Sequence, residues 1–310
     1  MKLLRRVQEI TELSAGCVAT IGNFDGVHRG HQALLGLLRE QASRMQLPMV
    51  VLLFEPQPGE YFNRQTAPAR LYRLREKLQA LRQCGVDYVY CLTFDRKLAN
   101  MSPEEFAEQI VFSRLNANYL LLGVDFRFGR DRLGDLALLR KLGHKKGAIV
   151  DTCSDFCVEQ ARVSSTQIRH ALYLGELDRA AALMGRKYSL CGRVKHGNGM
   201  GRQWGVPTAN LNVHQGGLPL SGVFCVKVKR KGKPALAGVA NIGNRPTIDG
   251  SKNVLEVHLF DFDESLYGEM LQVFFLHKLR DEIKFSSVDA LIAQIHLDVA
   301  AARNVYDLIE

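Results

Sequence analysis

Two histidines three residues apart, His28 and His31, follow a short apolar run and stand among glycines. The run Cys17–Ile21 predicts a buried strand, and the apolar spacing after the histidines predicts a helix over His31–Met45. Glycine at such a turn lets the backbone approach a ligand, and the free N–H groups at a helix start attract phosphate. Because residues three apart share a helix face, both histidines can direct N–H donors at one anion. The stretch predicts a nucleoside triphosphate site without the Gly-Lys-Ser/Thr ending of a P-loop; the alternative is a tight turn with two surface histidines.

A second cluster of candidate phosphate ligands lies at Ser164, Ser165 and Thr166, with Arg169 three residues later. A helical pattern follows, so the three hydroxyls can serve simply as a cap of that helix. The same hydroxyls can donate to phosphate oxygens, with the Arg169 guanidinium as a fork.

The Asp-Phe-Arg-Phe-Gly segment at residues 125–129 joins two aromatic side chains to one acidic and one basic side chain. It follows the predicted strand Tyr119–Gly123 and therefore lies at the sheet edge where parallel sheets bind ligands. The segment fits either a packed loop with a salt bridge or an aromatic wall for a flat ring.

Thr208 and Asn210 are two residues apart and follow a glycine-rich basic loop. A threonine hydroxyl and an asparagine carbonyl at this spacing can both reach one hard cation, although the pair also fits a turn. The candidate nucleotide ligands of the loop are Gly197, Gly199, Gly201 and Arg202.

Glu256 and His258 alternate with apolar residues in the stretch Leu255–Leu259. In a strand this alternation places both polar side chains on one face. That face is either the solvated outside of a sheet or the position of a carboxylate that acts as a base.

The order of the elements predicts two domains, over residues 1–184 and 185–310. The first alternates strand-like and helix-like runs, which predicts βαβ units and a parallel sheet covered on both faces. Its expected strands are Cys17–Ile21, Met49–Phe54, Asp87–Cys91, Tyr119–Gly123 and Ala148–Thr152, and its expected helices are His31–Met45, Leu71–Cys84, Pro103–Leu115 and Gly134–Leu142. The second changes to short alternating runs with hairpin turns, which predicts a closed antiparallel β-barrel with an amphipathic C-terminal helix against it. The expected barrel strands are Ser189–His196, Val223–Arg230, Ala235–Ile242, Val254–Phe262 and Leu271–Leu276.

Composition excludes several classes of protein. A length of 310 residues with 46% hydrophobic and 24% charged residues is typical of two globular domains with real cores. The net charge of +9 is spread over both halves, which fits pockets for phosphorylated ligands as well as a nucleic-acid surface. Seven cysteines without a C-x-x-C pair argue against a disulfide framework or a zinc site. No run approaches the length of a membrane span and the start lacks the apolar core of a signal peptide, so we expect a cytoplasmic protein.

The string Gly-Asn-Phe-Asp-Gly-Val-His-x-Gly-His at residues 22–31 resembles the adenylyltransferase half of the bacterial bifunctional riboflavin kinase/FAD synthetases. The H-x-G-H core alone resembles the wider nucleotidyltransferases and the class I tRNA synthetases, but no Lys-rich motif follows, which counts against aminoacylation. The resemblance implies a Rossmann-like nucleotidyltransferase domain, with Arg169 aiding His28 and His31 in catalysis. It further implies nucleotide contacts at Gly22, Asn23, Phe24, Gly26, Gly30, Ser164, Ser165 and Thr166, and flavin contacts at Asp125, Phe126, Arg127 and Phe128. Gln57 stands where the family usually has His.

The C-terminal half resembles riboflavin kinase, in motif order. The strings are the glycine-rich loop, Pro-Thr-Ala-Asn at 207–210, Gly-Val-Ala-Asn-Ile-Gly at 238–243, Arg-Pro-Thr at 245–247, Glu256 and Leu-Tyr-Gly at 266–268. By resemblance Thr208 and Asn210 help to hold Mg–ATP, Glu256 is the general base, and Asn241 and Arg280 contact the flavin.

The sequence therefore predicts a multifunctional transferase that uses ATP and Mg²⁺. Its barrel phosphorylates riboflavin to FMN, and its N-terminal domain joins FMN to AMP, giving FAD and pyrophosphate. The expected partners are these small molecules, with neither nucleic acid nor membrane, and no oligomeric state is predicted. Two alternatives are another nucleotidyltransferase with an accessory barrel and a non-catalytic flavin- or RNA-binding protein.

Overall fold

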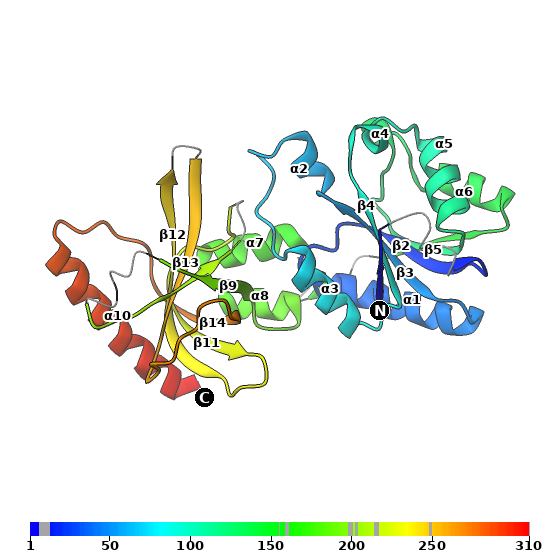
Figure 1. Ribbon diagram of the computed structural model, residues 1–310. Coiled ribbons are helices and arrows are strands. Elements are labelled where there is room, and N and C mark those ends of the chain that lie inside the picture. Colours follow the sequence, from blue (N-terminus) through cyan, green and yellow to red (C-terminus); the bar gives the residue numbers. More distant parts are fainter. Residues whose placement is uncertain are drawn as a thin grey trace. The chain divides into compact units, whose positions relative to one another are not determined.

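A computed structural model describes residues 1–5, 13–154, 156–158, 161–197, 201, 204–213, 217–247 and 250–309. The chain forms two compact units (Figure 1). The first contains Met1–Pro68 and Leu74–Val163, and the second contains Ala69–Arg73 and Ser164–Glu310. Within the described residues, no helix is both long and apolar enough to cross a membrane.

A six-stranded sheet organises the first unit. Its order is β1-β4-β3-β2-β5-β6, and each of its strand pairs is parallel. The strands are β1 (Lys2–Leu4), β2 (Cys17–Ile21), β3 (Met49–Glu55), β4 (Tyr88–Thr93), β5 (Ala117–Gly123) and β6 (Ile149–Cys153). The five expected strands are confirmed to within one or two residues at most ends, whereas β1, a three-residue edge strand, was not predicted. A short antiparallel pair, β7 (Cys157–Val158) and β8 (Ala161–Arg162), follows.

Helices connect these strands. They are η2 (Asp25–Val27), α1 (Arg29–Met45), α2 (Pro58–Phe62), α3 (Leu74–Gln83), α4 (Arg96–Ala99), α5 (Pro103–Glu105), η3 (Phe106–Arg114), η4 (Arg130–Arg132) and α6 (Leu136–Lys145). The expected helix over Pro103–Leu115 begins as the α-helix α5 and continues as the π-helix η3. The last hydrogen bond of η3 runs from the Leu115 N–H to the Ile110 carbonyl oxygen at 2.9 Å.

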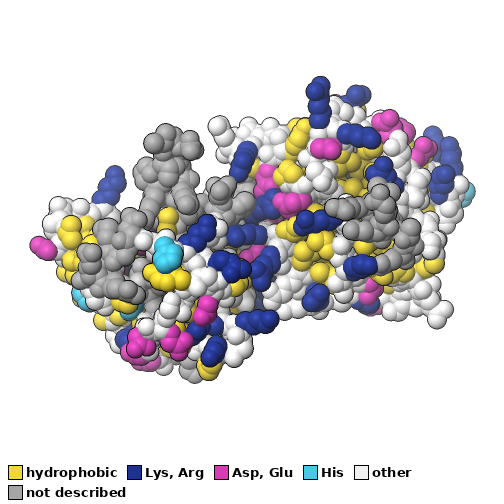
Figure 2. Space-filling view, in the orientation of Figure 1, with side chains coloured by type: hydrophobic (Ala, Val, Ile, Leu, Met, Phe, Trp, Pro, Cys, Tyr) yellow, Lys and Arg dark blue, Asp and Glu magenta, His cyan; other side chains and the backbone are white. Residues whose placement is uncertain are grey.

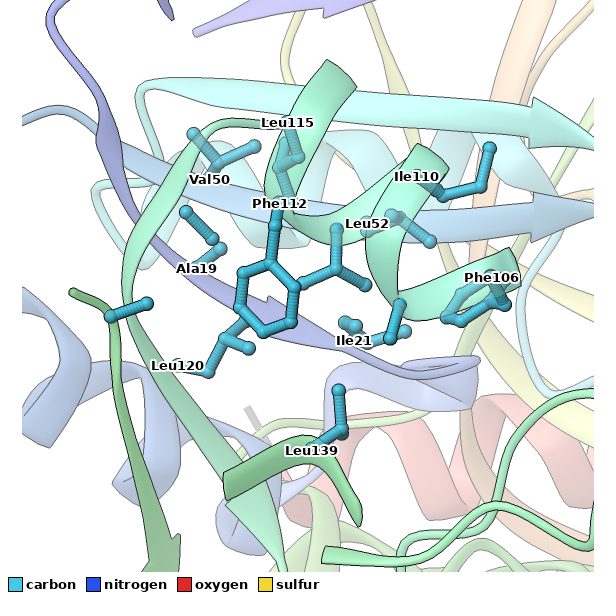
Figure 3. Close-up of a cluster of buried hydrophobic side chains, with 14 of the residues drawn as sticks. Ala19, Ile21, Val50, Leu52, Phe106, Ile110, Phe112, Leu115, Leu120 and Leu139 are labelled. Atoms are coloured by element: carbon cyan, nitrogen blue, oxygen red, sulfur yellow. The ribbon is translucent and has the colours of Figure 1, made fainter. Parts of the chain in front are cut away.

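The core of the first unit lies between the sheet and the helices η3 and α6 (Figure 3). Ala19, Ile21 and Leu52 of the sheet face side chains of η3, and the Phe112 ring lies in the middle of the cluster. Leu139 of α6 closes it on another side. A buried cluster of this kind fixes the strand ends, so the loops that follow them are held in place.

The position of β2 in the sheet explains why the histidine segment is suited to a ligand. From β2 the chain adds β3 and β4 on one side and then β5 and β6 on the other, so the order in which strands are added reverses at β2. Ligands of parallel sheets bind outside the carboxyl ends of strands at such a switch point. The segment at residues 22–31 follows β2 directly.

The second unit is a closed barrel with helices. The barrel order is β10-β13-β12-β11-β14-β9, and the six strands pair antiparallel throughout. Its elements are α7 (Ser165–Leu174), α8 (Leu177–Met184), β9 (Ser189–Lys195), β10 (Ala209–Asn212), β11 (Gly222–Arg230), β12 (Leu236–Thr247), β13 (Gly250–Leu259), β14 (Met270–Arg280) and α10 (Val288–Ile309). The five expected barrel strands are present, while β10, which begins inside the Pro-Thr-Ala-Asn string at Ala209, is an additional strand.

The predicted C-terminal helix is α10, which packs against β11, β12 and β14. Ala302 is fully buried, and Val299 packs against the same apolar cluster. The cluster also contains Val223 and Val239 from two barrel strands. The apolar stripe of the helix is therefore the face that covers the barrel. Figure 2 shows Lys and Arg side chains scattered over the visible face of both units among acidic and apolar ones.

Candidate active sites

A cavity of about 350 Å³ in the second unit brings together residues from most of the kinase-like strings. Six predicted site residues line it: Gly201, Thr208, Asn210, Asn241, Glu256 and Arg280. The remaining walls are Trp204, Val206, Val223, Val239, Ala240, His258, Glu282, Ile283, Phe285, Leu291, Ile295 and Asp298. Gly199 and Arg202 lie outside the described residues. Leu291 and Ile295 of α10 give the cavity apolar walls, and Asp298 of α10 and the side chains from β10 and β13 give it polar ones, a mixture that suits a flat ring with a polar tail.

Barrel register explains how three polar residues meet. Asn210 of β10 pairs with Glu256 of β13, and Glu256 pairs with Asn241 of β12. Side chains directly opposite each other on neighbouring strands have Cβ atoms about 5 Å apart. Glu256 therefore lies in a row between two asparagines on the strand face that lines the cavity.

Two glycines allow the loop before β10 to approach the candidate cation ligands. An added Cβ at Gly201 would lie 2.5 Å from the Val206 carbonyl oxygen, and one at Gly197 would clash with the Asn210 amide, whose Nδ2 is the nearest atom. Glycine at these two positions therefore lets the loop lie close to the segment that carries Thr208 and Asn210. The neutral oxygens of these two side chains suit Mg²⁺, which keeps waters and substrate phosphates in its coordination shell. Among the described residues no group of three His, Cys, Asp or Glu side chains could hold a metal ion.

His258 contacts the segment that carries Thr208. Its Nδ1 lies 2.9 Å from the carbonyl oxygen of Pro207. Burial is the main cause that lowers the pKa of His258 below its ordinary value, and this outweighs the bond to Pro207. The side chain is therefore neutral near pH 7. The sequence placed His258 beside Glu256, but the bond to Pro207 had no signal in the spacing.

Arg280 joins the barrel to α10. Its Nε and Nη2 donate to Asp298 Oδ1 and Oδ2 at 2.9 and 2.6 Å, and its Nη1 donates to the carbonyl oxygen of Asp281. Gln294 donates to the same carboxylate at 2.9 Å. The predicted flavin ligand Arg280 thus lines the cavity as part of an ion pair. Asp298 was missed because ion pairing between distant elements leaves no local pattern.

A second cavity of about 250 Å³ lies across β13 from the first. Val257 and Leu259 line it, whereas Glu256 and His258 line the first cavity, as alternation along a strand requires. Thr208 lines both. The other walls are Val194, Pro207, Ala209, Phe262, Asp263, Glu264, Ser265, Leu266 and Tyr267. Sequence reasoning did not predict this cavity.

The loop after β2 in the first unit has an unusual backbone. Phe24 and Val27 adopt positive φ angles of 47° and 41°, and Gly26 adopts 76°. A β-branched residue such as Val27 rarely takes this conformation, and strain of this kind clusters at ligand-binding loops. Val27 is fully buried and Phe24 nearly so, so packing holds the loop in this shape.

The two histidines lie against each other. The rings of His28 and His31 stack with centroids 3.6 Å apart, and Phe24 contacts the His31 ring at 4.7 Å. His28 is the N-cap of α1: its Nδ1 accepts from the His31 backbone N–H at 3.3 Å. Because Nδ1 accepts, a neutral His28 carries its proton on Nε2. The prediction that both rings share one face at the helix start is confirmed.

The loop at residues 125–129 combines features of both interpretations. Asp125 forms an ion pair with Arg162 at 2.6 Å. The rings of Phe126 and Phe128 stack at 5.7 Å, and Phe128 is buried in the core. Arg127 is exposed and its Nη1 donates to the carbonyl oxygen of Phe126. Phe126, half-buried at the surface, is the aromatic ring of this loop that a ligand can reach.

A second aromatic group lies at the carboxyl ends of β3 and β4. The ring of Tyr61 lies 5.3 Å from that of Phe94 and 5.4 Å from that of Phe62. Phe62 is 68% exposed although it is large and apolar. Among the described residues, none is hydrogen-bonded to the buried Nε2 of Gln57, at the start of α2. Sequence reasoning placed Gln57 at this edge but did not single out the aromatic residues.

The hydroxyl cluster begins α7 in the second unit. Ser164 is the N-cap, and its Oγ accepts from the Gln167 N–H at 3.3 Å. Its O–H group is still a donor in this role. Arg169 Nε donates to the carbonyl oxygen of Ala69 at 2.6 Å, which orients the guanidinium. The capping interpretation is correct for Ser164, and it is compatible with phosphate binding at the same helix start.

Comparison with known proteins covers both units. A family profile described as FAD synthetase matches residues 10–167, and one described as riboflavin kinase matches residues 184–306. Two relatives, from Haemophilus influenzae and Escherichia coli K12, are named bifunctional riboflavin kinase/FMN adenylyltransferase, and each is 46% identical to this chain. Both matches cover 99% of this chain; they cover 100% of the Haemophilus protein and 99% of the Escherichia protein. A crystal structure described as a macrolide-efflux protein from Streptococcus pneumoniae has a TM-score of 0.79 and 30% identity, and the match covers 97% of this chain and 99% of that one. The family resemblance is confirmed: the chain belongs to the bifunctional riboflavin kinase/FMN adenylyltransferases.

Proposed function

We propose that this chain makes FAD from riboflavin in two ATP-dependent steps, one in each of its two functional parts. The barrel transfers the γ-phosphoryl group of ATP to the 5′-hydroxyl of riboflavin, which gives FMN and ADP. The N-terminal part then joins FMN to the AMP portion of a second ATP and releases pyrophosphate. The observation that carries the proposal is the cavity in which Glu256 lies in register between Asn210 and Asn241.

In the kinase step, Glu256 is the proposed general base. It accepts the proton of the 5′-hydroxyl as that oxygen attacks the γ-phosphorus and the bond to the ADP oxygen breaks. Thr208 and Asn210 are the residues that would hold Mg²⁺. When bound, the ion would neutralise charge on the β- and γ-phosphates. The N–H groups of the loop with Gly197, Gly199 and Gly201, together with Arg202, position the phosphates.

The two cavities on either side of β13 suit the two substrates. The isoalloxazine ring occupies the first cavity, between Ile295 of α10 and Val239 of the barrel, where Asn241 offers its amide and Arg280 its guanidinium edge. The adenine ring occupies the second cavity, between Leu259 and Tyr267. Thr208 lines both cavities, so the phosphates of ATP, which run from the adenine cavity toward the riboflavin cavity, lie next to Thr208.

The adenylyl step needs no base. Its nucleophile is the FMN phosphate, which is mostly anionic because its second pKa is about 6. His28 and His31 of the first unit are the proposed groups that stabilise charge on the α-phosphate and the leaving pyrophosphate. The proposed nucleotide contacts of the first unit are Gly22, Asn23, Phe24, Gly26 and Gly30.

The flavin ring in this step has two candidate surfaces in the first unit. One is the 125–129 loop, where Asp125, Phe126, Arg127 and Phe128 are the proposed contacts. The other is the exposed Phe62 with Tyr61. Both follow carboxyl ends of sheet strands, where parallel sheets bind ligands.

Incubation with riboflavin and Mg–ATP, followed by chromatography of the flavins, tests the proposal. FMN and FAD peaks support it. Unchanged riboflavin would favour a non-catalytic flavin binder, and conversion of another substrate with unchanged riboflavin would favour a different nucleotidyltransferase.

A further inference from the structure

The side chain of His258 extends the connection between β10 and β13 beyond the end of their backbone ladder. The last pair of the ladder is Ala209 with Val257. One residue further along β13, the Nδ1 of His258 lies 2.9 Å from the carbonyl oxygen of Pro207. The side chain thus supplies a bond at the position where the two backbones no longer pair.

The carbonyl oxygen can only accept, so the proton of this bond belongs to His258 Nδ1. Pro207 has no N–H of its own and its φ is fixed by its ring. Just before it, the N–H of Val206 donates to the carbonyl oxygen of Gly201 at 2.8 Å, and Val206 is buried. Thr208 is therefore held from both sides, by the bond at Pro207 and by the ladder that starts at Ala209.

We propose that His258 is a positioning residue of the kinase step. By holding the Pro207 carbonyl it fixes the place of the Thr208 hydroxyl, and so the distance from the phosphoryl donor to Glu256. The proposal rests on the assignment of Thr208 and Asn210 to Mg–ATP above. It gives His258 no role as a base and no contact with the reacting atoms.

Two substitutions of nearly equal polarity separate this role from general packing. His258→Asn keeps a donor near the position of Nδ1, whereas His258→Gln moves the donor out to the position of Nε2. Loss of a hydrogen bond that orients a metal ligand typically weakens metal affinity or activity about 10- to 100-fold. We expect His258→Gln in the full-length protein to weaken Mg–ADP binding, measured by calorimetry, about 10-fold or more, and to raise the KM for Mg–ATP. His258→Asn should restore most of the affinity.

Three controls make the result specific. Formation of FAD from supplied FMN should be unchanged in His258→Gln, because His258 lies in the kinase unit. ADP binding without Mg²⁺ should change less than Mg–ADP binding. Thr208→Ala tests the underlying site: if Thr208→Ala leaves Mg–ADP affinity unchanged, the Mg–ATP assignment itself is wrong.

If Thr208→Ala weakens Mg–ADP binding but His258→Gln does not, the metal assignment stands and the role of His258 is overturned. Equal losses in the Asn and Gln variants would also overturn it, because the Nδ1 donor would then be irrelevant. A measurement on the unchanged protein does not depend on the folding of any variant. Long-range ¹H–¹⁵N NMR should find the His258 proton on Nδ1, and a ring protonated on Nε2 alone would contradict the proposal.

Discussion

Arg280 on the last barrel strand donates two hydrogen bonds to Asp298 on the C-terminal helix, at 2.9 and 2.6 Å. The side chains are 21% and 9% exposed, so the pair is largely removed from water. Both residues line the cavity assigned to riboflavin. The contact therefore links the stability of the helix packing to the shape of the flavin site.

Asp298→Asn should lower both stability and riboflavin affinity. Removing one partner of a buried ion pair leaves the other charge uncompensated and typically costs about 3 kcal/mol or more. Urea unfolding of the full-length protein measures the loss, and riboflavin titration measures the affinity. The matched control is Asp261→Asn, which breaks the exposed pair between Arg303 and Asp261. This control should lose much less, since exposed ion pairs contribute little; equal losses would contradict the assigned role of the buried pair.

His31→Ala should slow FAD formation. The change removes one donor to the triphosphate in the transition state, and loss of such a donor typically costs about 10²–10³ in rate. Phosphorylation of riboflavin should continue at its normal rate, because the kinase cavity lies in the other unit. Normal FAD formation by His31→Ala would show that the adenylyl site is misplaced.

His28→Ala should have an additional effect on stability, because His28 also caps α1. Loss of an N-cap typically costs about 1 kcal/mol. Thermal unfolding of the two variants should therefore differ, with His28→Ala less stable than His31→Ala. Equal stability would mean that the bond between His28 Nδ1 and the His31 N–H contributes nothing to the fold.

Strand positions in the first unit were predictable because buried parallel strands are continuous apolar runs. Met49–Glu55 is an example, since five of its seven residues are buried. β10 gave no such signal: it has four residues, and two of them are Asn. Its strand character comes from pairing with β9 and β13, which are distant in sequence.

A candidate site residue could be proposed from the sequence where it lies inside a recognisable short string, as Asn210 does in Pro-Thr-Ala-Asn and Asn241 does in Gly-Val-Ala-Asn-Ile-Gly. Such a residue was not predictable where two elements meet. Asp298 faces Arg280 only because α10 packs on β14, and the bond from His258 to Pro207 depends on where the β10 ladder ends. Such contacts depend on tertiary packing, which leaves no periodicity in either segment.

The fragment 185–310 should make FMN but never FAD. The change in hydrophobic period near Gly185 predicts that the barrel has its own core, and a part with its own core can fold alone. The fragment lacks α7, α8 and Leu71, whose carbonyl oxygen accepts from the Tyr188 hydroxyl at 3.2 Å. A fragment of residues 164–310, which keeps both helices, is the matched control and should be the more stable of the two. Chromatography of the flavins checks the products, and FAD from the shorter fragment would contradict the division of labour.

Glu256→Gln should stop the first reaction and spare the second. The change keeps the shape of the side chain in its row between Asn210 and Asn241 but removes the proton acceptor. Loss of a general base typically costs about 10²–10⁴ in rate. Binding of Mg–ATP and riboflavin should change far less, because binding in the ground state does not depend on proton transfer. Supplied with FMN, the same variant should still make FAD, because an anionic phosphate needs no base. Two assays on this variant, riboflavin to FMN and FMN to FAD, test the role of Glu256. If the variant still phosphorylates riboflavin, Glu256 is only a polar residue of the cavity wall. If it loses both activities, the change has damaged the fold or the two reactions are coupled.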